Sequence, residues 1–304
     1  MKKIMIISIV LVSSIALRGC SSNESTENSE TKNNQTVNVD IEQGITERVE
    51  GSYSKFAVEN QKLDVKSILK LLISEKEDSI DNMDMGTEEN TIETNGIKHT
   101  WSLVNNTFMY YNDKNIGIIE DKEKAENKAS EFVKMLGWDI SNNTEITTGD
   151  DGSLIYTYTL QHNGVELMGN YNVYLPDNDE TPVQGAYIEI GIGKEGIIRV
   201  YISGILNFND TIKSYDASKD FIDKEKLSKT VLTYYKEIYA DLGEDIKATL
   251  NIESFSIIYM PYREKKNIVL IPVYDVTLEK KINGNLQEAK MLIDAVDSYV
   301  YYAE

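Results

Sequence analysis

The chain has 304 residues, and its 50 acidic side chains outnumber its 31 basic ones, giving a formal net charge of −19. A surface this acidic repels nucleic-acid phosphates and anionic lipid headgroups, so the composition excludes DNA and RNA as expected partners. The single cysteine, Cys20, excludes an intramolecular disulfide. It also leaves the rest of the chain without a thiol for catalysis or for a thiolate metal site.

The first nineteen residues are typical of a secretory signal peptide. Two lysines follow the initial methionine, and residues 4–17 are almost wholly apolar. A run of about 14 residues is too short for a helix that crosses roughly 30 Å of hydrocarbon, but it suits the apolar region of a signal peptide. The segment therefore predicts export, whether it is cleaved or stays as an N-terminal anchor.

The next residues, Leu17-Arg18-Gly19-Cys20, resemble the lipobox of bacterial lipoproteins. In that family the thiol receives a diacylglyceryl group and the chain is cut before the cysteine. The resemblance therefore implies cleavage between Gly19 and Cys20, and a lipid anchor on Cys20 at the outer face of the cytoplasmic membrane. Arg18 departs from the family pattern, in which that position is small or uncharged. The alternative is that Cys20 is a free thiol behind a cleavable signal.

Residues 20–50 are predicted to form a disordered tether. They consist mainly of Ser, Asn, Thr and Glu, and such a segment buries too little apolar surface to offset its ordering entropy. About 30 flexible residues give an r.m.s. reach near 30 Å. Residues 1–19 hold three basic residues and no acid, so the chain from Cys20 onward carries a net charge of −22. The folded body is expected over residues 51–304.

Three helix signals divide this body into segments at 51–120, 121–215 and 216–304. The helices are expected at residues 63–74, 122–136 and 224–242, each from apolar residues at helical spacing. Asp121 and Gly137 are the predicted start and stop of the second helix, and Asp223 and Gly243 those of the third. The inner face of the third helix is predicted from Leu227, Val231, Tyr234, Tyr235, Ile238 and Leu242.

Strands follow each helix. They are expected at residues 98–111, 154–161, 165–175, 184–191, 197–208, 252–260, 268–278 and 290–302, and residues 81–95 read as a loop. Asn163-Gly164 and Asn283-Gly284 are hairpin signals. The second should join 268–278 to 290–302 beneath the third helix, with these residues toward the helix: Val269, Ile271, Val273, Leu292 and Ala295.

This order predicts the fold class. A helix followed by an antiparallel meander recurs, which indicates an α+β protein of two or three repeated units rather than a doubly wound parallel sheet.

Several stretches resemble the strands of PepSY-like modules, whose arrangement is cystatin-like. They read YTYTLQHNGVELMGNYNVYL, GIIRVYISGIL, IPVYDVTLE and LIDAVDSYVYY. The Pro-Val-Tyr strand of such modules matches at Pro272, and the closing strand matches at residues 293–297, with Asp294 where Asn is common and Ser298 where Gly is common. The YycI/YycH regulatory family of Gram-positive envelopes shows the same layout. The resemblance covers residues 122–304 and implies export and a regulatory or interaction role, with no catalytic residue.

The sequence offers no recognisable catalytic constellation. No HExxH, GxSxG or P-loop motif occurs. His99 and His162 are the only histidines; His162 is expected as a solvated residue beside the Asn163-Gly164 turn and His99 as a strand residue. Neither a catalytic residue nor a cofactor is predicted.

One stretch resembles the start of a calcium-binding loop. It is Asp216-x-Ser218-x-Asp220, but Phe221 stands where such loops have Gly, and Leu227 stands where they end in Glu. The stretch is therefore interpreted as the lead into the third helix, and no metal site is predicted.

Tyrosine is abundant, with 19 residues in the chain. Most fall on expected strands, where tyrosine suits half-buried sheet surfaces, and its rigid ring with a polar tip also suits binding faces. Tyr299, Tyr301 and Tyr302 are the candidate interaction surface.

Two function hypotheses follow. The first is a lipid-anchored, non-catalytic regulatory or protein-interaction module that has an envelope protein as its partner. The alternative is a solute- or glycan-binding lipoprotein, or a hydrolase that uses acidic residues, and it requires a deep cleft lined by acids and aromatic rings.

Overall fold

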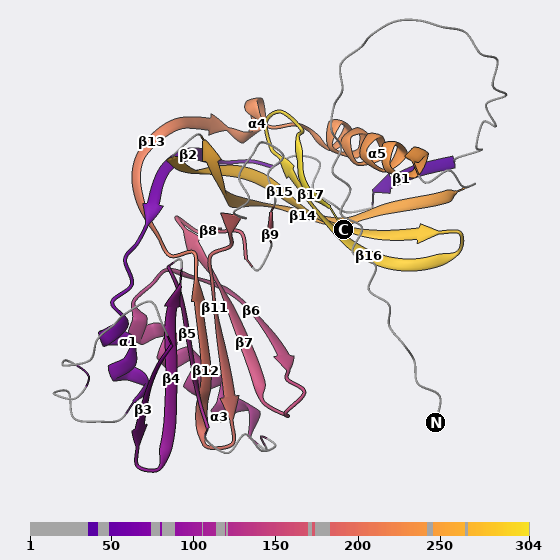
Figure 1. Cartoon of the computed structure of the whole chain (residues 1–304). Helices are drawn as coiled ribbons and strands as arrows, with labels where there is room; N and C mark the ends of the chain where they lie inside the picture. The colour runs from indigo at the N-terminus through magenta and orange to yellow at the C-terminus, as the bar shows by residue number, and fades with distance from the viewer. Residues whose placement is uncertain are drawn as a thin grey trace, which may run out of the picture. The chain divides into compact units, whose positions relative to one another are not determined.

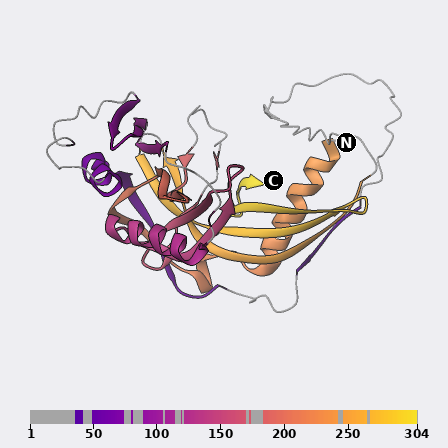
Figure 2. The same cartoon turned by 90° about the horizontal axis from the view of Figure 1, so that it is seen from below.

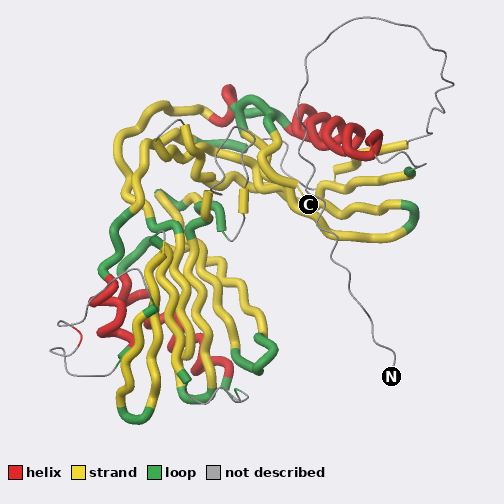
Figure 3. Tube along the Cα trace, viewed as in Figure 1, coloured by secondary structure: helices red, strands yellow, loops and turns green. Residues whose placement is uncertain are grey.

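The computed structural model describes residues 36–41, 49–73, 80, 89–104, 106–113, 119, 121–169, 172–173, 183–241, 246–264 and 267–303 (Figure 1). These residues all belong to one compact unit, residues 34–304. The predicted signal peptide, Cys20 and much of the predicted tether lie outside the described residues. The described part mixes helices with two large, mainly antiparallel sheets, which confirms the α+β class (Figure 3).

The first sheet has eight strands, all paired antiparallel. Its order is β3-β4-β5-β12-β11-β7-β6, with β8 paired to β7. The bounds are β3 (Asn90–Thr94), β4 (Ile97–Val104), β5 (Thr107–Asn112), β6 (Ile140–Thr148), β7 (Leu154–His162), β8 (Val165–Glu166), β11 (Tyr187–Gly193) and β12 (Gly196–Ser203). Two short strands, β9 (Asn172–Val173) and β10 (Val183–Gln184), pair with each other.

Helices α1 (Val65–Leu72) and α3 (Lys122–Leu136) share the core of this sheet (Figure 1). The bounds of α3 confirm the sequence prediction. Asp121 caps it by accepting the N–H of Lys124 at 2.9 Å, and Gly137 ends it with a φ of 71°. Its apolar stripe packs against the strands through Ala125, Ala129, Phe132 and Val133, all buried.

The second sheet has seven strands. Its path is β1-β14-β15-β16-β17, and β2 pairs with both β15 and β13. The bounds are β1 (Thr36–Ile41), β2 (Ser52–Asn60), β13 (Leu206–Asp216), β14 (Lys247–Glu264), β15 (Asn267–Ile282), β16 (Asn285–Asp294) and β17 (Val300–Ala303). The β1–β14 pair is parallel, and the other pairs of this sheet are antiparallel.

Two helices accompany this sheet, α4 (Ala217–Asp220) and α5 (Lys224–Asp241). Helix α5 lies across the strands (Figure 2). Its inner face differs from the predicted one: Leu227, Val231, Tyr235 and Tyr239 are buried, whereas Tyr234 is half-buried and Ile238 is 38% exposed. A spacing of four residues drifts by about 40° per step around a helix with 3.6 residues per turn, so the line of contact winds around α5. Leu242 and Gly243 lie outside the described residues.

Both faces of β15 are buried, and this overturns the predicted contacts of the third helix. The α5 side carries Tyr274, Val276 and Leu278, together with Met291 and Ile293 of β16. The opposite face carries the residues predicted to meet the helix: Val269, Ile271, Val273 and Leu292. Of the predicted set, Ala295 alone belongs to the α5 core.

The Asn283-Gly284 hairpin is confirmed. Both residues have positive φ, 48° and 90°, as a type I′ turn requires, and Ile282 pairs with Asn285 across it. The predicted strand at 290–302 is, however, two strands, because the chain turns between Asp294 and Val300 before β17 returns along β16.

Other strand predictions are corrected in the same way. Residues 98–111 span β4 and β5, and residues 197–208 span β12 and the start of β13, so each predicted strand is two strands. The described residues of 165–175 form the two short strands β8 and β9. The predicted loop at 81–95 contains β3, and β6 was not predicted. The predicted tether contains β1, whose Val37 is buried in the α5 core.

Helix-and-meander order is visible but does not define separate modules. After α3, strands β6, β7, β11 and β12 are neighbours in that order, and β14 to β17 are neighbours after α5. The predicted segments 51–120 and 121–215, however, both contribute strands to the eight-stranded sheet, and β2 and β13 of the same two segments pair with each other in the seven-stranded sheet. Within the described residues, no helix has the length and apolar character needed to cross a membrane.

Candidate interaction site

A groove of about 600 Å³ lies between α5 and the turn that precedes β17. We call it the α5 groove. It is lined by Lys226, Lys229, Thr230, Thr233, Tyr234, Glu237, Ser298, Tyr299 and Val300. It joins one helix face to the end strand of the seven-stranded sheet.

The helix side of the α5 groove is a polar stripe. Its members recur three or four residues apart, so they lie along one side of α5, next to the buried stripe. The hydroxyls of Thr230 and Thr233 donate to the carbonyls of Lys226 and Lys229 at 2.9 and 2.8 Å. Burial raises the pKa of Tyr234 above its ordinary value.

The strand side is held by the carboxylate of Asp294. One oxygen accepts the backbone N–H groups of Val296 and Asp297 at 2.8 and 3.0 Å. The other accepts the hydroxyl of Tyr301 at 3.0 Å. The N–H of Asp294 also donates to the carbonyl of Tyr299 at 2.7 Å. One side chain thus fixes both ends of the turn that carries Tyr299.

Ser298 adopts left-handed backbone in this turn, with a φ of 71°. Glycine adopts that conformation without the clash that a Cβ causes. Ser298 therefore holds a backbone conformation that favours glycine.

The three predicted surface tyrosines have different environments. Tyr299 is 44% exposed and lines the α5 groove. Tyr301 is half-buried, with its ring centroid 4.9 Å from that of Tyr299 and 5.8 Å from that of Tyr262. Burial, and then the nearby Asp294 carboxylate, raise the pKa of Tyr301. The side chain of Tyr302 lies outside the described residues. Tyr299 is therefore the predicted residue that reaches the groove.

Sequence reasoning missed the residues that α5 contributes. A polar stripe such as Lys226, Thr230 and Thr233 has the same spacing whether it lines a groove or faces solvent. The sequence does show that Tyr234 lies beside this stripe. The opposite wall of the groove, however, comes from a turn within residues 290–302, which the sequence predicts as one strand.

His99 lies in β4 and is buried in a polar network. Its Nδ1 is 2.8 Å from the hydroxyl oxygen of Tyr110, and its Nε2 is 3.0 Å from Oγ1 of Thr94. Asn112 donates to the same Tyr110 oxygen at 3.0 Å. With 3% of its surface exposed, His99 satisfies polar groups inside the sheet rather than facing a groove.

His162 is not the solvated turn residue that was predicted. Its ring stacks on Phe208 with a centroid distance of 3.6 Å and meets the edge of Phe56 at 5.0 Å. Burial lowers the pKa of His162 below its ordinary value. The neighbouring hairpin does form at Asn163-Gly164, but aromatic side chains from β2 and β13 cover the ring.

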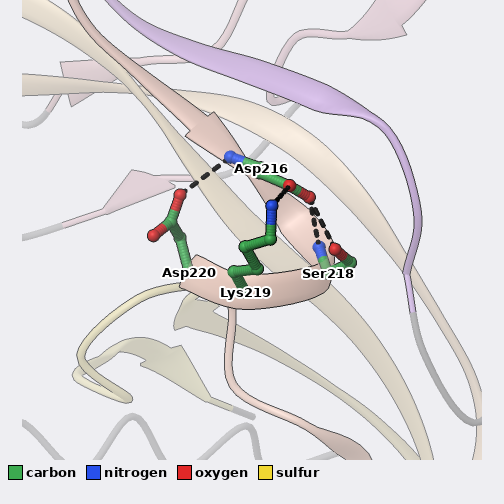
Figure 4. A network of polar contacts seen from close by, with 4 residues as sticks. All are labelled: Asp216, Ser218, Lys219 and Asp220. Atoms are coloured by element: carbon green, nitrogen blue, oxygen red, sulfur yellow. Dashed lines mark hydrogen bonds and ion pairs between the residues drawn. The ribbon is translucent and has the colours of Figure 1, made fainter.

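The calcium-loop resemblance at Asp216 resolves into a helix cap (Figure 4). One carboxylate oxygen of Asp216 accepts the N–H and hydroxyl of Ser218 at 3.1 and 2.7 Å, and the other accepts the ammonium of Lys219 at 2.7 Å. These bonds, that of Lys219 first, lower the pKa of Asp216 to about 2. The stretch does precede the third helix, as interpreted, but it forms a separate short helix, α4, before α5 begins at Lys224. Among the described residues, no cluster of His, Cys, Asp or Glu could hold a metal ion.

Comparisons with known proteins bear on the fold. No family model and no curated protein match the chain. The chain is similar to an uncharacterized protein from Eubacterium rectale ATCC 33656, with 14% identity and a TM-score of 0.52 over 89% of this chain and 92% of that one. It is also similar to the Bacillus megaterium YpeB C-terminal domain, with 12% identity and a TM-score of 0.36 over 81% of this chain and 97% of that one. The first likeness shows the fold alone, and the second is too weak to support a conclusion about function.

Proposed function

We propose that this chain is an exported, lipid-anchored cell-envelope protein that acts as a non-catalytic regulatory or protein-interaction module. Its partner binds in the α5 groove. In this proposal the segments from residue 122 onward act as PepSY-like helix-and-meander units, which display the groove above the outer face of the cytoplasmic membrane.

The observation that carries the proposal is the construction of the α5 groove. Tyr234 and Tyr299 bring aromatic surface to it, and such residues are enriched at the energetic centres of protein interfaces. The turn bearing Tyr299 is fixed by the four bonds of Asp294 to its neighbours. Because the turn is already ordered, binding loses less conformational entropy there.

Export and anchoring rest on the N-terminal sequence. A strain with the wild-type chain should incorporate labelled fatty acid into the protein, and Cys20→Ala should abolish the label and leave the precursor uncut. A wild-type chain that takes up no label would contradict the anchor but would leave the groove proposal standing.

A site-specific crosslink tests the partner. A photoreactive amino acid in place of the exposed Thr233 should give protein adducts on intact cells, whereas the same group in place of the exposed Glu131 on α3 should not. Tyr299→Ala in the Thr233 background should lower the adduct yield. Equal adducts from both positions would contradict a binding site in the α5 groove, and adducts with glycan alone would favour the solute- or glycan-binding alternative.

A further inference from the structure

We propose that the occupant of the α5 groove is an extended peptide segment that carries a carboxylate. It adds as a strand to the outer edge of β17 and places its acidic side chain against Lys226 and Lys229. This inference rests on the proposed function and names the class of partner for the same site.

The first observation is the sheet edge beside the groove. Strand β17 ends the path of the seven-stranded sheet, and no described strand pairs with its outer side. An edge strand presents backbone N–H and C=O groups that an added strand can pair with, and several peptide-binding domains use this mode. Val300 begins β17 and also lines the α5 groove, so a strand added there would run past the groove.

The second observation is the local charge. The chain carries −19, yet two of the three charged residues that line the groove are lysines, the third being Glu237. Lys226 and Lys229 are exposed and lie three residues apart, which makes them neighbours on one helix face. Within the described residues neither forms an ion pair. Glu237 follows Lys229 by two helical turns, roughly 12 Å along the axis. This distance exceeds the screening length of about 8 Å at physiological salt, so Glu237 neutralises Lys229 only weakly.

The third observation is the aromatic surface. Tyr234 is half-buried and Tyr299 is 44% exposed, so both offer ring surface in the groove. Alternate side chains of a strand point to the same side. We therefore expect a segment in which an apolar residue is followed, two positions later, by Asp or Glu. The apolar residue would contact the tyrosine rings, and the acidic residue would contact the lysines. A glycan could use the rings and hydroxyls but would leave the edge of β17 unused, which favours a peptide.

The test uses the chain from Ser21 onward and a displayed library of random 12-residue peptides. We expect enrichment of peptides with an acidic residue two positions from an apolar one. The strongest would be synthesised and its binding measured by fluorescence anisotropy. The double variant Lys226→Glu/Lys229→Glu should weaken binding by about tenfold or more, because two attractive charge pairs become repulsive. Lys124→Glu/Lys134→Glu on α3, with the same change in net charge, should leave it unchanged.

Strand addition has its own readout. Methylation of alternate backbone nitrogens in the peptide should abolish binding, because it removes the N–H groups that pair with β17. Bound peptide should slow amide hydrogen exchange in residues 300–303. Binding that survives methylation or charge reversal, or a library that yields no enriched peptide, overturns the inference.

These outcomes are distinct from failure of the proposed function. Suppose that a protein partner crosslinks at Thr233 and still binds the Lys226→Glu/Lys229→Glu variant. This result would leave the proposed function intact and would overturn the inference that the partner is an acidic peptide strand. Concentration-dependent dimers that dissociate in the double lysine variant would make a second copy the occupant and would also overturn it.

Discussion

The backbone of Ser298 is a point of strain in the turn before β17. Its φ of 71° costs an L-residue about 1–2 kcal/mol, whereas glycine avoids that cost but loses about 0.5–1 kcal/mol of chain entropy. We expect Ser298→Gly to raise the free energy of unfolding by about 0.5–1 kcal/mol, measured by urea denaturation.

Ser256 is the matched control, because it is exposed on β14 and is absent from the residues with positive φ. Ser256→Gly should lower the free energy of unfolding, since glycine weakens a strand interior. If both glycine variants destabilise the protein alike, the turn is not strained.

His162 contributes through its ring rather than through acid–base chemistry. Loss of the stack on Phe208 and of the contact with Phe56 in His162→Ala should cost about 1–2 kcal/mol. Because burial lowers the folded pKa of His162, the unfolded chain takes up the proton first as the pH falls below 6.5. The contribution of His162 to the free energy of unfolding is therefore complete above pH 6.5 and declines at lower pH.

His162→Phe is the control for that pH dependence. It keeps an aromatic ring in the stack but cannot be protonated, so its free energy of unfolding should change less between about pH 7.5 and 5.5 than that of the wild type. Urea denaturation at both pH values measures the difference. A steeper decline in the Phe variant would show that His162 is not the group responsible.

At the scale of elements, α5 and the strands beneath it form the second core. Val231 is fully buried there, and Val231→Asp places a charge without a partner in apolar surroundings. We expect a loss of about 4 kcal/mol or more, which should abolish cooperative unfolding of this part. Ile238→Asp on the same helix, at a position 38% exposed, should cost about 1 kcal/mol or less. Circular dichroism melts compare the two, and equal losses would refute the observed inner face.

The sequence predicted elements well where local chemistry decides them. The caps at Asp121 and Gly137, with one apolar stripe between them, were enough for α3. The faces of α5 and β15 were mispredicted because apolar residues lie on more than one side. When both faces of a strand are buried, alternation no longer tells which one meets the helix.

The candidate site was predicted only in part for a related reason. Tyr299 was predicted because tyrosine suits binding faces, and the structure places it in the α5 groove. The groove forms only when the turn fixed by Asp294 meets the side of α5, and no local pattern of α5 contains that information.

Strand β1 offers a further test at this scale. It pairs in parallel with residues Lys247 to Ile252 of β14, and Val37 is 6% exposed in the α5 core. A chain that starts at residue 49 should still fold but should exchange the amide hydrogens of residues 247–252 faster than a chain that starts at residue 34. Mass spectrometry after deuterium labelling measures this. Equal exchange in the two chains would mean that β1 adds no protection to the edge of β14.

At the scale of the whole molecule, buried tyrosines make the fold sensitive to alkali. Burial raises the pKa of Tyr158 to about 12 and raises those of Tyr110, Tyr187, Tyr259 and Tyr301 in the same direction. Their folded pKa values lie above the ordinary value of 10.0, so the unfolded chain loses these protons first. The stabilisation is therefore complete below about pH 10 and is lost as the pH rises toward the folded values.

We expect the urea midpoint to be nearly constant from about pH 8 to 9 and to fall steeply above about pH 10. Each new phenolate also adds to the repulsion within a chain that already carries −19. Tyrosinate absorbance should then rise together with the loss of structure, because the buried rings ionise on unfolding. Tyr158→Phe should make the fall shallower, whereas Tyr111→Phe, at a position 51% exposed, should not. A midpoint that holds steady to about pH 11 would show that the buried rings ionise without unfolding the chain.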